Sequence, residues 1–310
     1  MSTINLVIKL SLYILAGFAI VRSGKVPRDF HKQFSAFLMV IPMPALIIRS
    51  FYNTELSAEI MAQFGPTTLC TTLALIVLGL VGLFAKKIHK DPAEGQVCIY
   101  GMMTSNFNFF GMPIVEALFG NEGIFYYTLL TVVARVVYYG FPPYLLGEGH
   151  SLNVKEFIKQ MICAPVIAIF VGFAVYFTQI RFPEPIVGVM DGMANMASPM
   201  GMMLCGMTLA NANLKVAFTR PMPFVMCFIR LLLAPALVMA MTMVCGFAPL
   251  TSKLTIIYSM LPFGALMPTF ATRYCKHEHS AIYGSVLVSL ATVLSIFTVP
   301  IWIFIFQNVI

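Results

Sequence analysis

The chain has 310 residues, of which 59% are hydrophobic and only 10% charged, and its mean hydropathy is +0.89. Soluble domains of this length do not have such a composition, and apolar stretches near 20 residues long recur from end to end. The formal net charge of +7 does not indicate a nucleic-acid partner, because the basic residues lie scattered in short segments. We therefore expect an all-α polytopic protein that lies in a lipid bilayer.

Ten apolar segments follow one another along the chain. In order, we expect them at about 6–21, 34–51, 60–84, 96–119, 124–146, 161–177, 186–209, 222–247, 254–274 and 282–306. The first follows Met1–Asn5 without a basic leader or a cleavage site, so we interpret it as a retained helix and not as a signal peptide. The seventh holds small residues from Gly188 to Gly201, which suit close helix contact.

Two features recur in the two halves of the chain. Pro42-Met43-Pro44 in the second segment corresponds to Pro199-Met200-Gly201 in the seventh, and Met112-Pro113 in the fourth corresponds to Met267-Pro268 in the ninth. Both offsets are about 155 to 157 residues, which indicates an internal repeat of five helices. We expect repeats at 1–146 and 161–310 with a cytoplasmic loop at 147–160. With an odd number of spans in each repeat, the second must be inverted.

The distribution of basic residues predicts the orientation in the membrane. The loops after spans 1, 3, 5, 7 and 9 carry most of the basic residues: Arg22, Lys25, Arg28, Lys32, Lys86, Lys87, Lys90, Lys155, Lys159, Lys215, Arg220, Arg273 and Lys276. On the other side we place only Arg49, Arg181 and Lys253. Lysine and arginine mark the cytoplasmic side, so both termini are expected to face outward from the cytoplasmic (plasma) membrane.

Segments 4 and 9 are each interrupted near their middle. Proline removes a backbone donor, and irregular backbone survives at membrane depth only where protein or a water-filled cavity satisfies it. Paired interruptions of this kind indicate a transporter's substrate site. We expect the second half-helices to begin near Met112-Pro113 and Met267-Pro268, and to attract anions with their N-terminal ends. Ser105, Asn106, Asn108 and Thr269 would supply hydrogen bonds there. The alternative is that these prolines only kink their helices.

Three ionisable residues deep in the apolar segments are candidate site residues. Arg135 lies roughly 16 Å into span 5 and Arg230 roughly 12 Å into span 8, at 1.5 Å per residue. An arginine at this depth is costly and is usually functional or paired, so both are candidate substrate contacts, with snorkelling or pairing as the alternatives. Glu116 is either a proton site or the partner of Arg135.

Metal, cofactor and enzyme chemistry find little support. The seven cysteines lie in or beside apolar runs without metal-like spacing, so we interpret them as packing residues. His277-Glu278-His279 is too short for the zinc motif of a metalloprotease and is expected in a solvated loop. We expect no metal site, no cofactor and no enzymatic activity.

The motifs together resemble the auxin efflux carrier family, which includes plant PIN-type auxin exporters and bacterial permeases assigned to malate or malonate. The resemblance covers nearly the whole chain and is carried by four stretches of modest individual specificity: Ile41–Leu46, Asn108–Gly120, Met207–Ala210 and Leu261–Tyr274. It implies ten helices in two inverted repeats, with helices 4 and 9 crossing, as in sodium/proton antiporters and bile-acid symporters. It further implies a scaffold from helices 1, 2, 6 and 7, a transport domain from helices 3–5 and 8–10, dimerisation and elevator-like alternating access.

The family's substrate site lies at that crossover, and the resemblance assigns to it residues from both breaks. Together with the residues chosen above, the expected substrate-binding set is Ser105, Asn106, Asn108, Gly111, Pro113, Arg135, Arg230, Pro262, Gly264, Pro268 and Thr269, with Pro42, Pro44 and Pro199 lining it from the scaffold. The long cytoplasmic loop of many plant members is missing, and the break in span 9 has no asparagine. Both departures favour a small carboxylate over an indole as the substrate.

The leading hypothesis is thus a secondary transporter of a small organic anion. The alternatives are a sodium- or proton-coupled symporter of the bile-acid-symporter type and a membrane receptor that binds without transporting. Sodium dependence of the flux distinguishes the first alternative, and a measurable flux in vesicles excludes the second.

Overall fold

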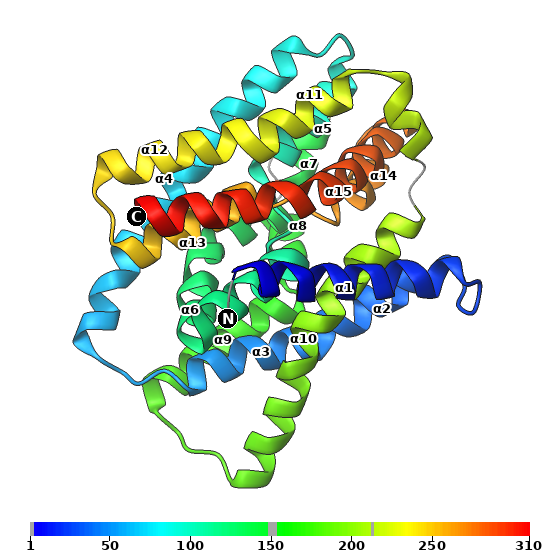
Figure 1. The fold of residues 1–310 in the computed structure, drawn as a ribbon. Helices are drawn as coiled ribbons and strands as arrows, with labels where there is room; N and C mark the ends of the chain where they lie inside the picture. Colours follow the sequence, from blue (N-terminus) through cyan, green and yellow to red (C-terminus); the bar gives the residue numbers. More distant parts are fainter. Residues whose placement is uncertain (1–2, 148–153, 212–213) are drawn as a thin grey trace. The chain divides into compact units, whose positions relative to one another are not determined.

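The computed structural model describes residues 3–147, 154–211 and 214–310, and these form helices joined by short connections (Figure 1). Among the described residues, five helical stretches are long and apolar enough to cross a membrane, namely Phe30–Tyr52, Ala58–Ile88, Phe107–Gly140, Met222–Cys245 and His279–Val309. Many large apolar side chains are exposed, among them Leu80, Phe170 and Phe297. So much exposed apolar surface fits a protein whose outer face meets lipid.

The chain divides into two compact units, each assembled from separate parts of the sequence. Unit 1 comprises residues 1–68, 108–131 and 162–211, and unit 2 comprises 69–107, 132–161 and 212–310. The division therefore does not follow the two halves of the sequence. The expected repeats, and the expected scaffold and transport domains, stay predictions.

Unit 1 is a helical bundle in which the long helix α10 packs against two other helices. Its helices are α1 (Thr3–Arg22), α2 (Phe30–Val40), α3 (Pro42–Tyr52), α9 (Ala164–Thr178) and α10 (Glu184–Ala210), with the start of α4 (Ala58–Ile88) and most of α6 (Met112–Arg135). Helix α10 packs against α1 and α3, and α3 also packs against α9. Phe51 of α3 is fully buried and contacts the rings of Phe125 and Phe173, so aromatic packing joins α3, α6 and α9.

Unit 2 is organised around the last helix. It contains α5 (Pro92–Met103), α7 (Pro142–Leu146), α8 (Val154–Met161), α11 (Met222–Phe228), α12 (Ala234–Cys245), α13 (Pro249–Met260), α14 (Met267–Tyr274) and α15 (Glu278–Val309), with a 3₁₀ helix η3 (Leu214–Thr219). Helix α15 packs against α5, α11, α13 and α14. Trp302 of α15 donates its indole N–H to the Leu231 carbonyl at 2.8 Å, which satisfies a buried polar group within this packing.

Each of the ten expected segments coincides with one helix or with helices in series, although the number that cross the bilayer stays a prediction. The second segment is divided at Ile41, because Pro42 starts α3 at a position where no backbone donor is needed. Segments 4 and 5 are separated at Gly120, whose φ of 60° and ψ of −149° suit only glycine. The stretch expected as a loop at 147–160 is in part wrong, since Val154–Met161 is helical; residues 148–153 lie outside the described residues.

Within the described part of the chain, three π-helical turns interrupt the α-helices, and each lies at or beside a predicted site residue. The turn η1 (Phe107–Gly111) contains Asn108, η2 (Val136–Gly140) directly follows Arg135, and η4 (Ile229–Leu233) contains Arg230. Such turns widen a helix locally and occur often at functional sites. Their positions therefore direct attention to these three polar side chains.

Candidate functional site

Within unit 2 the two interrupted segments meet. The backbone N–H of Asn106 donates to the Pro262 carbonyl at 3.0 Å, and that of Gly264 donates to the Thr104 carbonyl at 3.2 Å. Ser105 and Phe263 thereby form an antiparallel bridge. Each break supplies the hydrogen bonds that the other lost on leaving the helix, which is how irregular backbone can persist in a buried place. The sequence prediction that the two breaks lie close together is confirmed for Thr104–Asn106 and Pro262–Gly264.

Arg230 holds the two carbonyl ends that approach this crossover. Its Nε donates to the Leu261 carbonyl at 3.0 Å and its Nη1 to the Met102 carbonyl at 2.6 Å, while Nη2 donates to the Ser105 hydroxyl. The side chain is fully buried. Helices α5 and α13 end here, and a cation beside two helix C-termini is favourable because both ends carry partial negative charge. These contacts give Arg230 a structural role at the crossover.

Aromatic side chains surround the same place. The Tyr138 hydroxyl accepts a hydrogen bond from the backbone N–H of Leu266 at 3.1 Å, directly before α14, and Tyr100 donates its hydroxyl to the Tyr138 carbonyl at 2.8 Å. A Cβ on Gly264 would lie 2.5 Å from the Tyr138 ring, so only glycine fits at this point of the break. The crossover is thus a tightly packed, buried structure.

Arg135 is the second buried cation of unit 2. Only 1% of it is exposed, and its guanidinium lies 4.8 Å from the centroid of the Phe107 ring. A cation over an aromatic face is stabilised by the negative face of the ring, more strongly when water is excluded. Phe107 directly follows the break at Thr104–Asn106, so a positive charge is kept next to that break.

The α-helices after both breaks begin where predicted, but an additional helical turn precedes one of them. Helix α14 starts at Met267, as expected, with Pro268 in its first turn. After the first break, α6 likewise starts at Met112, as expected, and the π-helical turn η1 (Phe107–Gly111) leads into it. The turn η1 ends at Gly111, before Pro113, and its wider spacing accommodates the missing N–H of this proline without a break.

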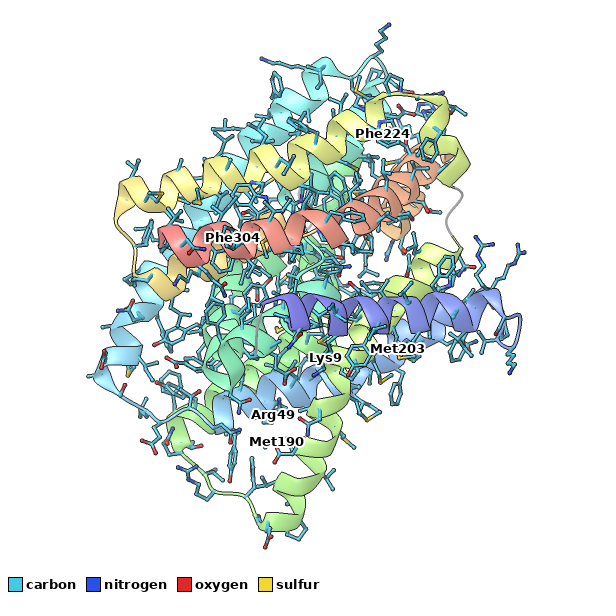
Figure 2. The ribbon with its side chains drawn as sticks, in the orientation of Figure 1. Lys9, Arg49, Met190, Met203, Phe224 and Phe304 are labelled. Atoms are coloured by element: carbon cyan, nitrogen blue, oxygen red, sulfur yellow. The ribbon has the colours of Figure 1, made fainter. Side chains whose placement is uncertain are left out.

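A separate polar cluster occupies unit 1, and sequence reasoning missed it. Arg49 Nη2 lies 2.6 Å from Glu116 Oε1, and Arg49 Nη1 lies 2.5 Å from Asn195 Oδ1. Ser198 donates its hydroxyl to Glu116 Oε2. The three helices α3, α6 and α10 each contribute, and Figure 2 labels Arg49 on α3 together with Met190 and Met203 on α10. The alternative that Glu116 pairs with Arg135 is therefore wrong, because its ion-pair partner is Arg49, and its role as a proton site stays a prediction.

The expectation that Arg49 lies in an outer loop is wrong. It lies in α3, which continues to Tyr52, and only 7% of it is exposed. Lys253, expected on the same side, lies in α13. The signal for Arg49 was present, because the apolar run of the second segment extends beyond it to Phe51-Tyr52. Asn195 and Ser198, three residues apart on one helix face, indicated a polar stripe on α10.

The other predicted site residues are divided between the units. In unit 1, Asn108, Gly111, Pro113 and Pro42 are buried, whereas Pro44 and Pro199 are half-buried. In unit 2, Pro262 and Gly264 are buried within the crossover, Pro268 is half-buried, and Thr269 is exposed.

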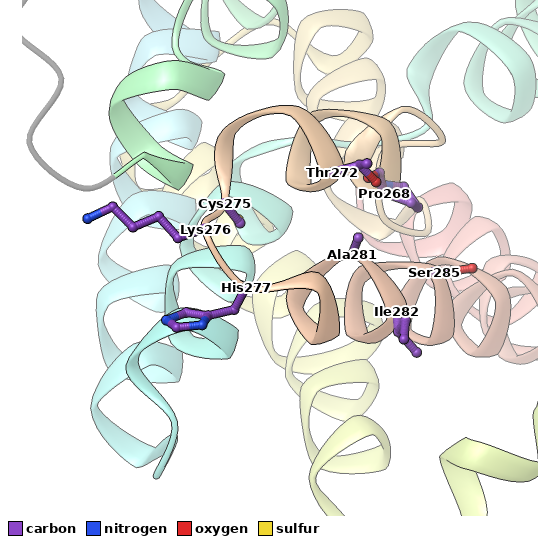
Figure 3. Close-up of a pocket in the computed structure, with 8 residues that line it drawn as sticks. All are labelled: Pro268, Thr272, Cys275, Lys276, His277, Ala281, Ile282 and Ser285. Carbon is purple, nitrogen blue, oxygen red and sulfur yellow. The ribbon is translucent and has the colours of Figure 1, made fainter.

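A cavity of about 610 Å³ lies between α14 and α15 in unit 2 (Figure 3). Pro268 and Thr272 line one end, and Lys276 and His277 lie at the other; Cys275, Ala281, Ile282 and Ser285 complete the lining. The cavity therefore runs from the first turn of α14 to the basic connection that follows this helix.

One residue of the sequence His277-Glu278-His279, namely His279, belongs to a polar cluster of unit 2. His279 Nε2 lies 2.9 Å from Asp91 Oδ2, and Asp91 also accepts hydrogen bonds from the backbone N–H groups of Ala93 and Glu94 at the start of α5. Asp91, Glu94 and His279 form the one group of three potential metal ligands among the described residues, with ligand atoms within 4.8 Å of one another. Arg220 lies 3.0 Å from Glu94 and supplies a positive charge there already.

Comparison with known proteins identifies the family. A family model described as "Membrane transport protein" matches residues 2–141 and 145–303. The chain belongs to this family, the auxin efflux carrier family. It is 22% identical to an "Uncharacterized transporter" of Methanothermobacter thermautotrophicus, over 97% of this chain and 98% of that protein. It is 21% identical to an "Uncharacterized transporter" of Methanocaldococcus jannaschii, over 99% of this chain and all of that protein.

A bacterial relative carries a substrate in its name. The chain is 21% identical to a protein of Rhizobium meliloti named "Putative malonate transporter", over 92% of this chain and 90% of that protein. The family and the names of these relatives indicate a membrane transporter and not an enzyme. With its apolar helices, this auxin efflux carrier family member is an integral membrane protein by family and composition.

Proposed function

We propose that this chain is a secondary transporter that carries a small organic anion, a carboxylate or dicarboxylate such as malate or malonate, across the cytoplasmic membrane. The observation that carries the proposal is the crossover of unit 2, where two interrupted helices meet beside the buried cations Arg135 and Arg230. Membership of the family and the name of the Rhizobium relative support the same reading.

The crossover offers several groups that suit an anion. The N-terminal end of α14 carries partial positive charge, and the half-buried Pro268 lies in its first turn. Ser105 and Asn106 supply polar side chains at the break, and Arg135 supplies a full positive charge beside Phe107. An oxyanion in this environment gains charge-assisted hydrogen bonds that are stronger than neutral ones. From the family resemblance we further propose elevator-type alternating access and a homodimer.

The membrane potential favours one direction of transport for an anion. Each negative charge that crosses the membrane is worth about 2.3 kcal/mol per 100 mV, so an inside-negative potential favours export without a coupling ion. Uptake of a dicarboxylate requires a co-transported cation, and Glu116 is the proposed proton carrier. If Glu116→Gln leaves uptake driven by a pH gradient unchanged in proteoliposomes, Glu116 does not carry the proton. A flux that follows a sodium gradient instead supports the bile-acid-symporter type of coupling.

The proposal is tested by flux. We expect proteoliposomes containing the purified protein to exchange radiolabelled malonate or malate, and Asn106→Ala to reduce the flux about fivefold to tenfold, as expected for one lost hydrogen bond of about 1 to 1.5 kcal/mol. Asn121→Ala is the matched control, because Asn121 is exposed and lies outside both breaks. Absence of flux for all mono- and dicarboxylates, with binding retained, would identify a receptor and reject the transporter.

A further inference from the structure

We propose that Arg49, Asn195 and Ser198 form a carboxylate-binding site that the side chain of Glu116 occupies in this structure, and that a free carboxylate takes its place when Glu116 moves away. That this carboxylate belongs to the transported anion rests on the function proposed above. The site lies entirely within unit 1, on α3, α6 and α10.

The geometry around Glu116 is that of a bound carboxylate. One oxygen, Oε1, lies 2.6 Å from the Arg49 guanidinium, and the other, Oε2, accepts the Ser198 hydroxyl. A guanidinium and a hydroxyl directed at the two oxygens of one carboxylate combine charge with a fixed orientation. Asn195 accepts a hydrogen bond from Arg49 at 2.5 Å and so holds the plane of the guanidinium. These groups recognise the carboxylate and not the rest of the glutamate side chain.

The site has an unused donor. The Nε atom of Arg49 is buried and has no hydrogen-bond partner among the residues that the structure describes. The Arg49 side chain is only 8% exposed, so this N–H is also shielded from water. A buried donor without a partner is unfavourable. A ligand with more oxygens than Glu116 presents can satisfy it, which favours a dicarboxylate over a monocarboxylate.

Glu116 is the member of the cluster that can leave. Its side chain is 23% exposed, compared with 8% for Arg49, so Glu116 is the more accessible partner of the ion pair. Because Glu116 is tethered, its effective concentration at Arg49 is about millimolar or higher. A free carboxylate must compete with it, so its apparent dissociation constant equals the intrinsic one divided by the fraction of time that Glu116 leaves the site free.

Removing the internal competitor is therefore the test. Purified Glu116→Ala should bind malonate, measured by titration calorimetry, at least about tenfold more tightly than the natural protein. Acetate should bind it more weakly than malonate. The double variant Arg49→Gln with Glu116→Ala should show no such gain. Glu122→Ala is the matched control, since Glu122 is an exposed acid on the same helix α6 and should leave malonate affinity unchanged.

Two results would overturn the proposal. One is a folded, monodisperse Glu116→Ala protein that binds malonate no better than the natural protein, which would make the ion pair a structural link between helices. The other is a gain in affinity that persists in the double variant. If Glu116→Ala does not fold, Glu116→Gln replaces it; it keeps the shape, removes the charge, and should give a smaller gain in affinity that Arg49→Gln again abolishes.

Failure here is distinguishable from failure of the proposed function. Malonate flux by the natural protein without tighter binding in either Glu116 variant rejects the carboxylate site and leaves transport intact. Tighter binding in the variants, with no malonate flux by the natural protein, retains the carboxylate site and rejects transport of malonate.

Discussion

At the scale of single residues, Arg230 shows how one buried cation can hold two broken helices together. It donates to carbonyls at the ends of α5 and α13 and to Ser105 between them. In an apolar environment none of these groups has water as a substitute partner. The stability of the crossover should therefore depend on this one side chain.

We expect Arg230→Gln to lower the stability of the protein by about 3 kcal/mol or more, because hydrogen bonds to a charged group are lost and buried carbonyls are left without partners. The measurement is the midpoint of thermal unfolding in detergent. Arg273→Gln is the control, since Arg273 is an exposed arginine of the same unit. Equal midpoints for the two variants would show that Arg230 does not hold the crossover.

His89 makes stability depend on pH. Burial lowers the pKa of its imidazole below the usual 6.5, with Asp91 raising it in part and Arg220 lowering it further. Its Nε2 lies 2.7 Å from the Tyr283 hydroxyl, and its Nδ1 lies 3.7 Å from Glu94. Below about pH 6.5 the unfolded chain binds a proton that the folded protein does not, so stability falls as the pH falls from 6.5 through the folded pKa.

We therefore expect His89→Gln to weaken the loss of thermal stability on acidification from pH 7 into this range, because glutamine takes up no proton. The two nearby acids, Glu94 and Asp91, contribute to stability with a different dependence on pH. Burial raises the pKa of Glu94, with Arg220 opposing, so Glu94 adds stability as the pH falls. Burial alone would raise the pKa of Asp91, but hydrogen bonds from Ala93, Glu94 and His279 lower it, so its contribution is lost only below about pH 3.8. An unchanged pH profile in His89→Gln would contradict the prediction.

At the scale of elements, α10 shows that small residues do not by themselves mark a helix contact. From the sequence we expect close helix contact at the small residues from Gly188 to Gly201. In the structure a Cβ on Gly188 or Gly192 meets nothing within 4 Å, so that part of the expectation is wrong. Gly201 lies against the Phe109 carbonyl, 2.8 Å from the position of an added Cβ, and Gly206 lies against the backbone of α1 at Ile14. The glycines of α10 that make close contacts therefore lie in its C-terminal half.

Because Gly206 is tightly packed and Gly188 is not, replacing each glycine by alanine should have different effects on stability. Gly206→Ala should destabilise the protein, because the added methyl group meets backbone atoms of α1 that cannot turn aside. Gly188→Ala should be neutral or stabilising by up to about 1 kcal/mol, since alanine favours a helix where space is open. Thermal unfolding of both variants decides the matter, and a larger loss at Gly188 would refute the packing described for α1 and α10.

At the scale of the whole molecule, the distribution of basic residues predicts which connections face the cytoplasm. In a cysteine-free background, Lys90→Cys should react with an impermeant maleimide only after cells are permeabilised, whereas Glu55→Cys should react in intact cells. Both positions are exposed and lie at opposite ends of α4. The reverse labelling pattern would invert the predicted topology and put both termini inside.

The structure corrects the positions of two basic residues on which the predicted orientation depends, and the prediction itself is unchanged. Arg49 and Lys253 were counted as outer-loop residues, yet they lie in α3 and α13. Arg181 remains in a connection on the predicted outer side, while Lys25, Arg28, Lys90, Arg220 and Lys276 lie in connections on the other side, so the asymmetry remains.

The sequence by itself determined the class of the protein, the approximate bounds of its helices and the location of both breaks. These follow from local causes, namely apolar run length, the missing donor of proline and the φ tolerance of glycine at Gly120. Only the tertiary structure decided that Arg49 pairs with Glu116, that Arg230 bonds to Met102 and Leu261, and that a π-helical turn beginning at Phe107 leads into α6. Arg230 lies 31 residues along the chain from Leu261 and 128 from Met102, and Arg49 lies 67 residues from Glu116. No local sequence pattern encodes which distant group a buried cation contacts.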